Sequence, residues 1–194
     1  MKPEKSGEEN KKSILKRDSQ LIKECFEGRE DSFAKLISFY QNRVRAVGLQ
    51  FFRNQTDTED FMQEVFIKVY KNLSSFRGES SFATWITRIA YTTAINAKNA
   101  KKDCESLADD FEIKSEFKTP EEEQVFNLTK EAVREAIKEL PLNYAICLDF
   151  YFFYDFSYEE IAIITGFPVN TIKSHIFRAK KILRQKLLEY SYKS

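Results

Sequence analysis

The chemistry that this sequence supports best is binding of a polyanion by a basic segment near its C-terminus. Residues 169–194 carry seven basic side chains against a single acid. In a DNA-recognition helix the early positions reach base edges, while Lys and Arg reach phosphates. The side chains here that a core does not need include Thr171, Lys173, Ser174, Arg178, Lys181 and Arg184. We predict that the first three contact bases or the groove, and that Arg178 and Lys181 contact mainly phosphates.

Histidine and cysteine are too sparse for a metal centre. His175 lies in the same basic segment, as either a DNA contact or a neutral, half-exposed imidazole, and the two interpretations are equally supported. The three cysteines, Cys25, Cys104 and Cys147, are far apart and fit neither a disulfide framework nor a zinc knuckle. With a single histidine, no zinc site and no other cofactor are expected.

A helix-turn-helix pattern positions the basic segment. Ser157 and Glu160 form a capping box that opens a short helix. Gly166 can adopt a positive φ and ends that helix, and a final helix is predicted from about residue 170 to residue 189. Ile172 would anchor the final helix in the core. This spacing is typical of elements that place one helix in the major groove.

The rest of this second domain is also predicted to be helical. One helix face carries Val133, Ile137 and Leu140, and a short apolar helix follows. The aromatic run FYFFYDF, residues 150–156, could be a strand by itself, but its helical flanks favour a helix end and a turn. We place the domain at residues 121–190, with a tail at residues 191–194.

A first domain is predicted at residues 18–102, after a polar N-terminal tail at residues 1–17. Its first helix runs from Asp18 to Phe26. Asp31 is expected to cap a long second helix that continues to about Val47.

The clearest amphipathic pattern lies in the middle of this domain. Thr56 and Glu59 form a capping box, and apolar side chains follow at helical spacing: Phe61, Met62, Val65, Phe66, Val69, Tyr70 and Leu73. After a turn at Gly78, a last helix begins near Ser81 and buries a face that includes Trp85.

The net charge of +1 hides a partition along the chain. Residues 84–102 carry four bases and no acid, whereas residues 103–123 carry nine acids against two lysines. Periodicity fades in the same stretch, so residues 103–120 are predicted to form a flexible acidic linker. Two basic segments around an acidic one suggest two separate contacts with a polyanion. Charge alone equally allows solvated helix faces around a disordered linker.

Composition favours an all-α fold with two small helical domains joined by that linker. Of 194 residues, 42% are hydrophobic, and only 5 Gly and 4 Pro interrupt the elements. No apolar run reaches the roughly 18 residues of a membrane span. The first residues lack the apolar core of a signal peptide, so a cytoplasmic protein without membrane insertion is expected.

Two parts of the chain resemble one known family. Region four of the extracytoplasmic-function (ECF) RNA polymerase sigma factors is similar to residues 140–187, LPLNYAICLDFYFFYDFSYEEIAIITGFPVNTIKSHIFRAKKILRQKL. Region two of that family resembles residues 58–76, TEDFMQEVFIKVYKNLSSF, and its promoter-melting helix resembles residues 82–96, FATWITRIAYTTAIN. The two regions occur in the family's order. The resemblance implies an alternative sigma factor, not an enzyme, that binds core RNA polymerase and directs promoter-specific transcription initiation.

The resemblance also implies which residues bind. The helix from Asp60 to Lys71 would dock on core polymerase through Asp60, Gln63, Glu64 and Ile67, although spacing alone favours a solvated acidic face. The minus-ten element would be held by Arg88, Tyr91, Thr92, Asn96, Lys98, Lys101 and Lys102, because aromatic rings stack on unstacked bases and cations hold phosphates. The minus-thirty-five element would be contacted by Thr171, Lys173, Ser174, His175, Arg178 and Lys181. Family members are usually held inactive by an anti-sigma factor, so such a partner is expected.

Five positions depart from the family's usual pattern: Thr92, Asn96, Ala145, Asn170 and His175. The last two lie on the predicted recognition helix, so the promoter sequence that is read here is expected to be unusual.

Two other functions compete with the resemblance. The run NTIKSHIFRAKKIL also resembles the recognition helix of stand-alone LuxR-type regulators, but the first domain looks unlike a receiver or sensor module. An enzyme could use Asp60 and Glu64 with Glu121–Glu123 as carboxylates, but no histidine or Gly-rich phosphate loop accompanies them.

Overall fold

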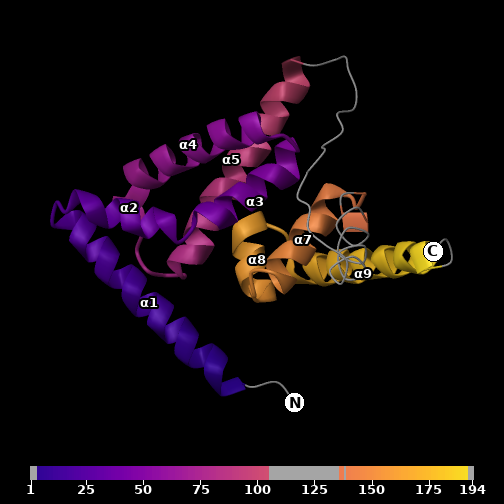
Figure 1. Ribbon diagram of the computed structural model, residues 1–194, viewed down its shortest axis with the longest axis horizontal. Coiled ribbons are helices and arrows are strands. Elements are labelled where there is room, and N and C mark those ends of the chain that lie inside the picture. Colours follow the sequence, from indigo (N-terminus) through magenta and orange to yellow (C-terminus); the bar gives the residue numbers. More distant parts are fainter. Residues whose placement is uncertain (1–3, 105–135, 138, 192–194) are drawn as a thin grey trace, which may run out of the picture.

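The structure, a computed structural model, describes residues 4–104, 136–137 and 139–191. Every element in these residues is helical, which confirms the predicted all-α class. The elements are α1 (Glu4–Phe26), α2 (Glu30–Ser38), α3 (Gln41–Phe52), α4 (Gln55–Asn72), the 3-10 turn η1 (Leu73–Ser75), α5 (Phe82–Cys104), α7 (Leu142–Phe152), α8 (Tyr158–Thr165) and α9 (Val169–Ser191) (Figure 1). We call α1–α5 the N-terminal half and residues 136–191 the C-terminal half.

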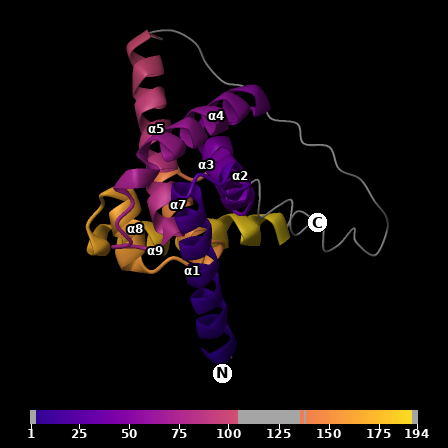
Figure 2. The same ribbon diagram turned by 90° about the vertical axis from the view of Figure 1, so that its left-hand side faces the viewer.

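The N-terminal half is a bundle in which α3, α4 and α5 pack against one another and α1 packs against α2. Its fully buried side chains include Leu36, Val44, Val65, Val69 and Ile86. The helices α3 and α4 approach closely at Gly48, where an added Cβ would lie 2.8 Å from a ring carbon of Phe61. Helix α1 extends away from the bundle, and the Cys104 end of α5 projects beyond it (Figure 1, Figure 2).

Helix α1 is longer than the sequence predicted. It begins at Glu4, inside the stretch predicted as a polar tail, and not at Asp18. Phe26, which was expected on its apolar stripe, is 59% exposed. The stripe that packs is narrower, because only Ile22 is buried and Leu21 and Cys25 are half-buried.

The long helix predicted after Asp31 is wrong, because the chain breaks between α2 and α3 at Phe39 and Tyr40. The Tyr40 ring is 4% exposed, lies edge-on to Phe82 with ring centroids 5.3 Å apart, and donates its hydroxyl hydrogen to Asp18. The break therefore inserts Tyr40 into the core and ties α1 to it. Asp31 lies inside α2, whose N-cap is Arg29.

Helix α4 is capped by Asn54, so the predicted box of Thr56 and Glu59 is wrong. The Asn54 side chain accepts a hydrogen bond of 2.8 Å from the backbone N–H of Asp57. Because Asn54 lies two residues before the predicted capping residue, α4 begins earlier than the sequence predicted. Tyr70, predicted on the buried face of this helix, is 67% exposed.

The C-terminal half follows its predicted pattern closely. The Ser157 hydroxyl accepts from the backbone N–H of Glu160 at 3.1 Å, and the Glu160 carboxylate accepts from the backbone N–H of Ser157 at 2.9 Å, which confirms the capping box. Gly166 ends α8 with a φ of +76°. The aromatic run ends α7 and enters a turn in which Phe156 is buried, so the preference for helix over strand is confirmed.

The two halves pack against each other. Helix α8 contacts α5, α7 contacts α3, and one cluster of buried hydrophobic side chains continues through both halves. An exposed salt bridge of 3.3 Å also joins Lys11 of α1 to Asp155 in the turn after α7. The packing of the two halves fixes the position of the polar face of α5 relative to that of α9.

Part of the predicted organisation lies outside the described residues. This holds for the acidic linker from residue 105 onward and for Val133, whereas residues 103–104 belong to α5. In the described part of the chain, no helix combines the length and apolar content needed to cross a lipid bilayer.

Candidate nucleic-acid and protein interfaces

Helix α9 is fixed by an apolar stripe that leaves its other sides free for contacts. Ile172, Ile176 and Ala179 are at most 3% exposed and pack against the other helices of the C-terminal half. Of the predicted DNA contacts on this helix, the exposed ones are Lys173, Arg178 and Lys181, and the half-buried ones are Thr171, Ser174 and His175. A helix anchored in this way can present its first turns to a groove.

Aromatic side chains hold two of these cations. The Lys173 Nζ lies 5.5 Å from the ring centroid of Tyr158 at the start of α8. The Arg178 Nη1 donates a hydrogen bond of 3.2 Å to the hydroxyl oxygen of Tyr144, and this bond raises the pKa of Arg178 further. Both side chains are therefore partly oriented before any ligand binds.

His175 is surrounded by apolar groups. Its ring lies 5.0 Å from that of Tyr144 and 5.4 Å from that of Phe167, measured between centroids, and its Nδ1 is 3.7 Å from the Cys147 Sγ. Burial, with the nearby charge of Arg178, lowers the pKa of His175. This geometry favours the neutral, half-exposed imidazole, and a DNA contact by His175 stays a prediction.

Phe177 is a candidate contact that the sequence reasoning missed. It is 69% exposed on α9, between Lys173 and Lys181 along the helix. The signal was present in the sequence, because the buried stripe recurs at Ile172, Ile176 and Ala179 and Phe177 falls outside it. An exposed phenyl ring on such a helix can contact thymine methyl groups.

Helix α5 presents a polar line on one side. Arg88, Thr92 and Asn96 are exposed, and their spacing of four residues places them on one face. Lys98 is half-buried. Lys101 and Lys102 lie in the last turns of α5, where their side chains fall outside the described residues.

Tyr91 does not belong to this line. It is 5% exposed and packs edge-on against Phe51 with ring centroids 5.8 Å apart, and burial raises the pKa of its hydroxyl. In this arrangement its ring cannot stack on a base, so the expected contact by Tyr91 is not supported. Trp85 packs against Phe76 and Phe82 with centroids 5.4 and 5.5 Å away, in agreement with its predicted core role.

Helix α4 presents the third polar face. Asp60, Gln63 and Glu64 are exposed, and Ile67 is 55% exposed. Lys68 pairs with Glu64 at 2.6 Å and reaches Thr93 of α5 at 3.3 Å. The exposed ring of Tyr70 lies one turn further on, against Phe33 with ring centroids 5.0 Å apart. It therefore adds apolar surface to this face, although the sequence predicted that Tyr70 is buried.

Comparison with known proteins shows which family regions match the segments that carry these three polar faces. Residues 36–103 match the family Sigma-70 region 2, and residues 130–183 match Sigma-70, region 4. The ECF RNA polymerase sigma-E factor of Haemophilus influenzae is 33% identical over 180 residues, which cover 88% of this chain and 95% of that protein. This chain belongs to the ECF sigma factor family. The RNA polymerase sigma-H factor of Pseudomonas aeruginosa is 32% identical over 88% of this chain and 93% of its own.

Solved structures share the fold of this sigma factor. CnrH in complex with the cytosolic domain of CnrY has a TM-score of 0.64 and 18% identity, over 90% of this chain and 98% of that one. The sigma factor RpoE from Bartonella quintana, in complex with the anti-sigma factor NepR, has a TM-score of 0.63 and 20% identity, over 81% of this chain and 96% of that one. At 18% and 20% sequence identity, the similarity to these two structures shows a shared fold.

Family membership also bears on the competing functions. Sigma factors regulate transcription initiation and are not enzymes, and the match at residues 36–103 argues against a stand-alone LuxR-type regulator. Among the described residues, no cluster of three His, Cys, Asp or Glu side chains could hold a metal ion.

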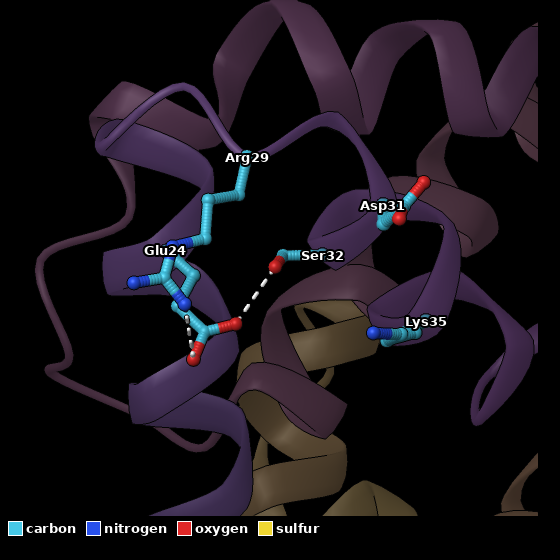
Figure 3. A pocket seen from close by; sticks show the side chains of 5 residues that line it. All are labelled: Glu24, Arg29, Asp31, Ser32 and Lys35. Carbon is cyan, nitrogen blue, oxygen red and sulfur yellow. Dashed lines mark hydrogen bonds and ion pairs between the residues drawn. The ribbon is translucent and has the colours of Figure 1, made fainter.

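An open hollow between α1 and α2 of this sigma factor has a structural explanation. It is lined by Glu24, Arg29, Asp31, Ser32 and Lys35 (Figure 3). The Ser32 hydroxyl donates to Glu24 at 2.7 Å, and Arg29 lies 3.7 Å from the same carboxylate. Hydrogen bonds from Gln20 and Ser32 lower the pKa of Glu24. The carboxylate is therefore an ionised tie between two helices, unlike a raised-pKa catalytic acid.

Proposed function

We propose that this sigma factor directs RNA polymerase to its promoters through three surfaces on α4, α5 and α9. The observation that supports this most directly is that each surface is a polar line beside a buried apolar stripe, on a segment matched to region 2 or region 4. A buried stripe fixes the helix, so the polar line keeps its position when a ligand binds.

The docking surface binds core polymerase. It consists of Asp60, Gln63, Glu64 and Ile67. Its acids would meet basic side chains of the polymerase, and the exposed Ile67 with the neighbouring Tyr70 would supply apolar area at the centre.

The minus-ten surface holds the opened strand. It consists of Arg88, Thr92, Asn96, Lys98, Lys101 and Lys102. Without Tyr91, readout on α5 depends on hydrogen bonds from Thr92 and Asn96, while the cations hold phosphates. A base-stacking platform would have to come from another part of the complex or from movement of Tyr91.

The minus-thirty-five surface enters the major groove. It consists of Thr171, Lys173, Ser174, His175, Arg178 and Lys181, with Phe177 as an added apolar contact. Lys173 lies over the ring of Tyr158, and Arg178 donates a hydrogen bond to the hydroxyl oxygen of Tyr144. DNA binding would therefore cost less side-chain conformational entropy than it would for unsupported cations.

An anti-sigma factor is the expected regulator. RpoE of Bartonella quintana was solved in complex with the anti-sigma factor NepR, and CnrH with the cytosolic domain of CnrY. A protein that covers the docking surface would keep this chain from the polymerase. We further propose that the chain works in the cytoplasm, where polymerase and promoter DNA are found.

Reconstituted transcription tests the proposal. Core polymerase with and without this protein would be incubated with promoter DNA recovered from genomic fragments. We expect specific initiation only when the protein is present, and loss of initiation in the variant Asp60→Lys/Glu64→Lys, because charge reversal on the docking surface repels the same partner.

A matched variant controls for charge. Asp31→Lys/Glu79→Lys reverses two exposed acids outside the three surfaces and should initiate normally. If the protein did not stimulate core polymerase but bound duplex DNA tightly by itself, it would be a free-standing regulator. Equal loss in both variants would place the docking surface elsewhere.

A further inference from the structure

We propose that Cys147 fixes the position of the ring proton on His175, so that the neutral imidazole donates a hydrogen bond from Nε2–H to an acceptor on a base edge of the minus-thirty-five element. Cys147 is then a positioning residue, and His175 determines part of the promoter sequence that is read. The inference rests on the proposed function for the DNA contact. The position of the proton is a property of the free protein and can be measured without DNA.

Cys147 and His175 form a pair between two packed helices, α7 and α9. The Sγ of Cys147 lies 3.7 Å from the Nδ1 of His175, which is hydrogen-bond distance for the large sulfur atom. Cys147 is 0% exposed, whereas the ring of His175 is half-buried. Nδ1 is therefore the ring nitrogen that faces the interior. Because the thiol occupies Nδ1, the nitrogen that is left for a ligand is Nε2.

The thiol is the donor of this hydrogen bond. Burial raises the pKa of the Cys147 thiol to about 12, so the sulfur keeps its proton at neutral pH. Burial, with the nearby charge of Arg178, lowers the pKa of His175, so the imidazole is neutral there. A neutral imidazole accepts at one nitrogen and carries its hydrogen on the other, and sulfur is a weak acceptor. The S–H group therefore pairs with the lone pair of Nδ1, and the ring hydrogen lies on Nε2.

Two aromatic rings hold the imidazole in its orientation. The ring centroid of His175 lies 5.0 Å from that of Tyr144 on α7, with 40° between the ring planes. It lies 5.4 Å from that of Phe167, in the turn between α8 and α9, with 90° between the planes. Contacts with both rings and with the thiol restrict rotation of the side chain. A donor that is oriented before binding loses less conformational entropy when it meets its acceptor.

Nε2 belongs to the side of α9 that carries other proposed DNA contacts. Thr171, His175 and Arg178 are spaced by four and three residues, which places them on one side of the helix. Among the described residues, the buried side-chain nitrogen that lacks a hydrogen-bond partner belongs to Arg43, so Nε2 is not an enclosed, unpaired group. Arg178 donates to the hydroxyl oxygen of Tyr144, the same residue that packs on the imidazole. A neutral donor and a cation are thus presented side by side.

The chemistry of Nε2–H selects among bases. In the major groove guanine offers the acceptors N7 and O6, adenine offers N7 and thymine offers O4, whereas cytosine presents an amino donor. A fixed N–H donor pairs with any of these acceptors and is left opposite another donor at cytosine. Because the imidazole is neutral, this contact releases no counterions from the DNA. His175 therefore contributes to sequence preference, whereas Lys173 and Arg178 contribute to salt-dependent affinity.

Nuclear magnetic resonance of nitrogen-labelled histidine in the full-length chain tests the position of the proton. His175 is the only histidine in the sequence, so every histidine signal belongs to it. At neutral pH we expect a protonated Nε2 and an unprotonated Nδ1. Cys147→Ala should let the proton exchange between the two nitrogens, because the donor is gone. Cys147→Ser keeps a donor and should retain the wild-type pattern, and Cys25→Ala, which removes a thiol on α1, should have no effect.

Promoter binding tests the base contact. Core polymerase with this chain would be bound to the promoter fragments from the transcription assay, with each base pair of the minus-thirty-five element substituted in turn. His175→Phe should lose about two- to tenfold of the preference at one base pair, the effect of one hydrogen bond, without a change in salt dependence. His175→Gln keeps an amide donor and should retain most of that preference.

A double-variant comparison shows whether Cys147 acts through the imidazole. Cys147→Ala should reduce the base preference of the wild-type chain but not that of His175→Gln, since the amide needs no thiol to orient its hydrogens. An equal reduction in both backgrounds would mean that Cys147 only supports the fold, which would overturn its role as a positioning residue.

Four further results would overturn the inference. In the free protein they are a proton on Nδ1 or shared by both nitrogens, and a wild-type pattern that Cys147→Ala leaves unchanged. On DNA they are an unchanged base profile in His175→Phe, and an equal loss of affinity for every substituted fragment. Failure of the proposed function would look different, because the protein would not stimulate core polymerase while the histidine spectrum stayed as expected.

Discussion

The interior of each half and the contact between the halves use different side chains. Inside the halves, most fully buried positions are apolar, such as Val65 and Ile86 in one and Ile161 and Ile172 in the other. Between the halves, the guanidinium of Arg43 and the Asp149 carboxylate are half-buried beside aromatic rings, at the edge of an apolar cluster that continues through both halves. Exposure of apolar side chains costs free energy, whereas the two charged groups would regain hydration if the halves separated. The contact is therefore more polar than either interior.

Truncation of an interior side chain should have the largest effect on the free energy of unfolding. Ile86→Ala removes a fully buried side chain of α5 and should destabilise the protein by about 2–5 kcal/mol, through lost transfer free energy and the remaining cavity. Urea unfolding followed by circular dichroism measures this. The matched variant Ile67→Ala, at a position that is 55% exposed, should stay within about 0.5 kcal/mol of the wild type. Equal losses would mean that the interior is not what stabilises this half.

Loss of the capping box should have an intermediate effect, confined to the C-terminal half. Ser157→Ala removes the acceptor for the backbone N–H of Glu160 and should reduce the free energy of unfolding by about 1 kcal/mol. Ser19→Ala, at an exposed serine of α1, serves as the control. Hydrogen exchange should accelerate in α8 before α4. Uniform acceleration in both helices would show that the two halves unfold as one unit.

A change of pH should have the smallest effect and should act on the contact between the halves. Burial raises the pKa of Asp149 to about 6 from an ordinary 3.8, and the groups that face it are Gln50 and Tyr154, with Arg43 beyond. The state with the halves in contact therefore binds the proton more tightly than a state in which they have separated. Lowering the pH from about 7.5 to about 5.5 should favour the contact about fourfold.

Electron-spin distances between labels at Lys35→Cys in α2 and Lys180→Cys in α9, two exposed positions, would report this shift in a chain whose Cys25 and Cys104 are replaced by Ser. The variant Asp149→Asn keeps the shape of the side chain without the titrating group and should respond less to pH. A ratio that falls as the solution becomes more acidic would contradict the assigned burial of Asp149.

The sequence predicted two local features of the C-terminal half correctly, although it misplaced the cap of α4, which is Asn54 and not Thr56. The capping box at Ser157 and the end of α8 at Gly166 were found because both depend on neighbouring backbone groups. The break at Tyr40 was not, since it depends on Asp18 and Phe82, which are distant in sequence. Short-range patterns cannot show a contact that only tertiary packing creates.

Two tyrosines illustrate the same limit at the candidate site. Tyr70 was expected inside and is exposed, while Tyr91 was expected on the DNA surface and is buried against Phe51. Tyrosine has both an apolar ring and a polar tip, so helical spacing alone does not decide its side. Charged positions such as Glu64 and Arg88 were placed correctly on the outside, because burial of an unpaired charge costs too much.

The carboxylate of Glu160 connects two properties that usually vary separately. One oxygen caps the helix that precedes α9, and the other accepts the hydrogen bond from Thr84 across the halves. A mutation at this position is therefore pleiotropic: it alters the support of α9 and the contact between the halves in a single step. Evolution could retune that contact without the other effect more readily through Thr84 or Gln50, whose side chains take no part in the capping box.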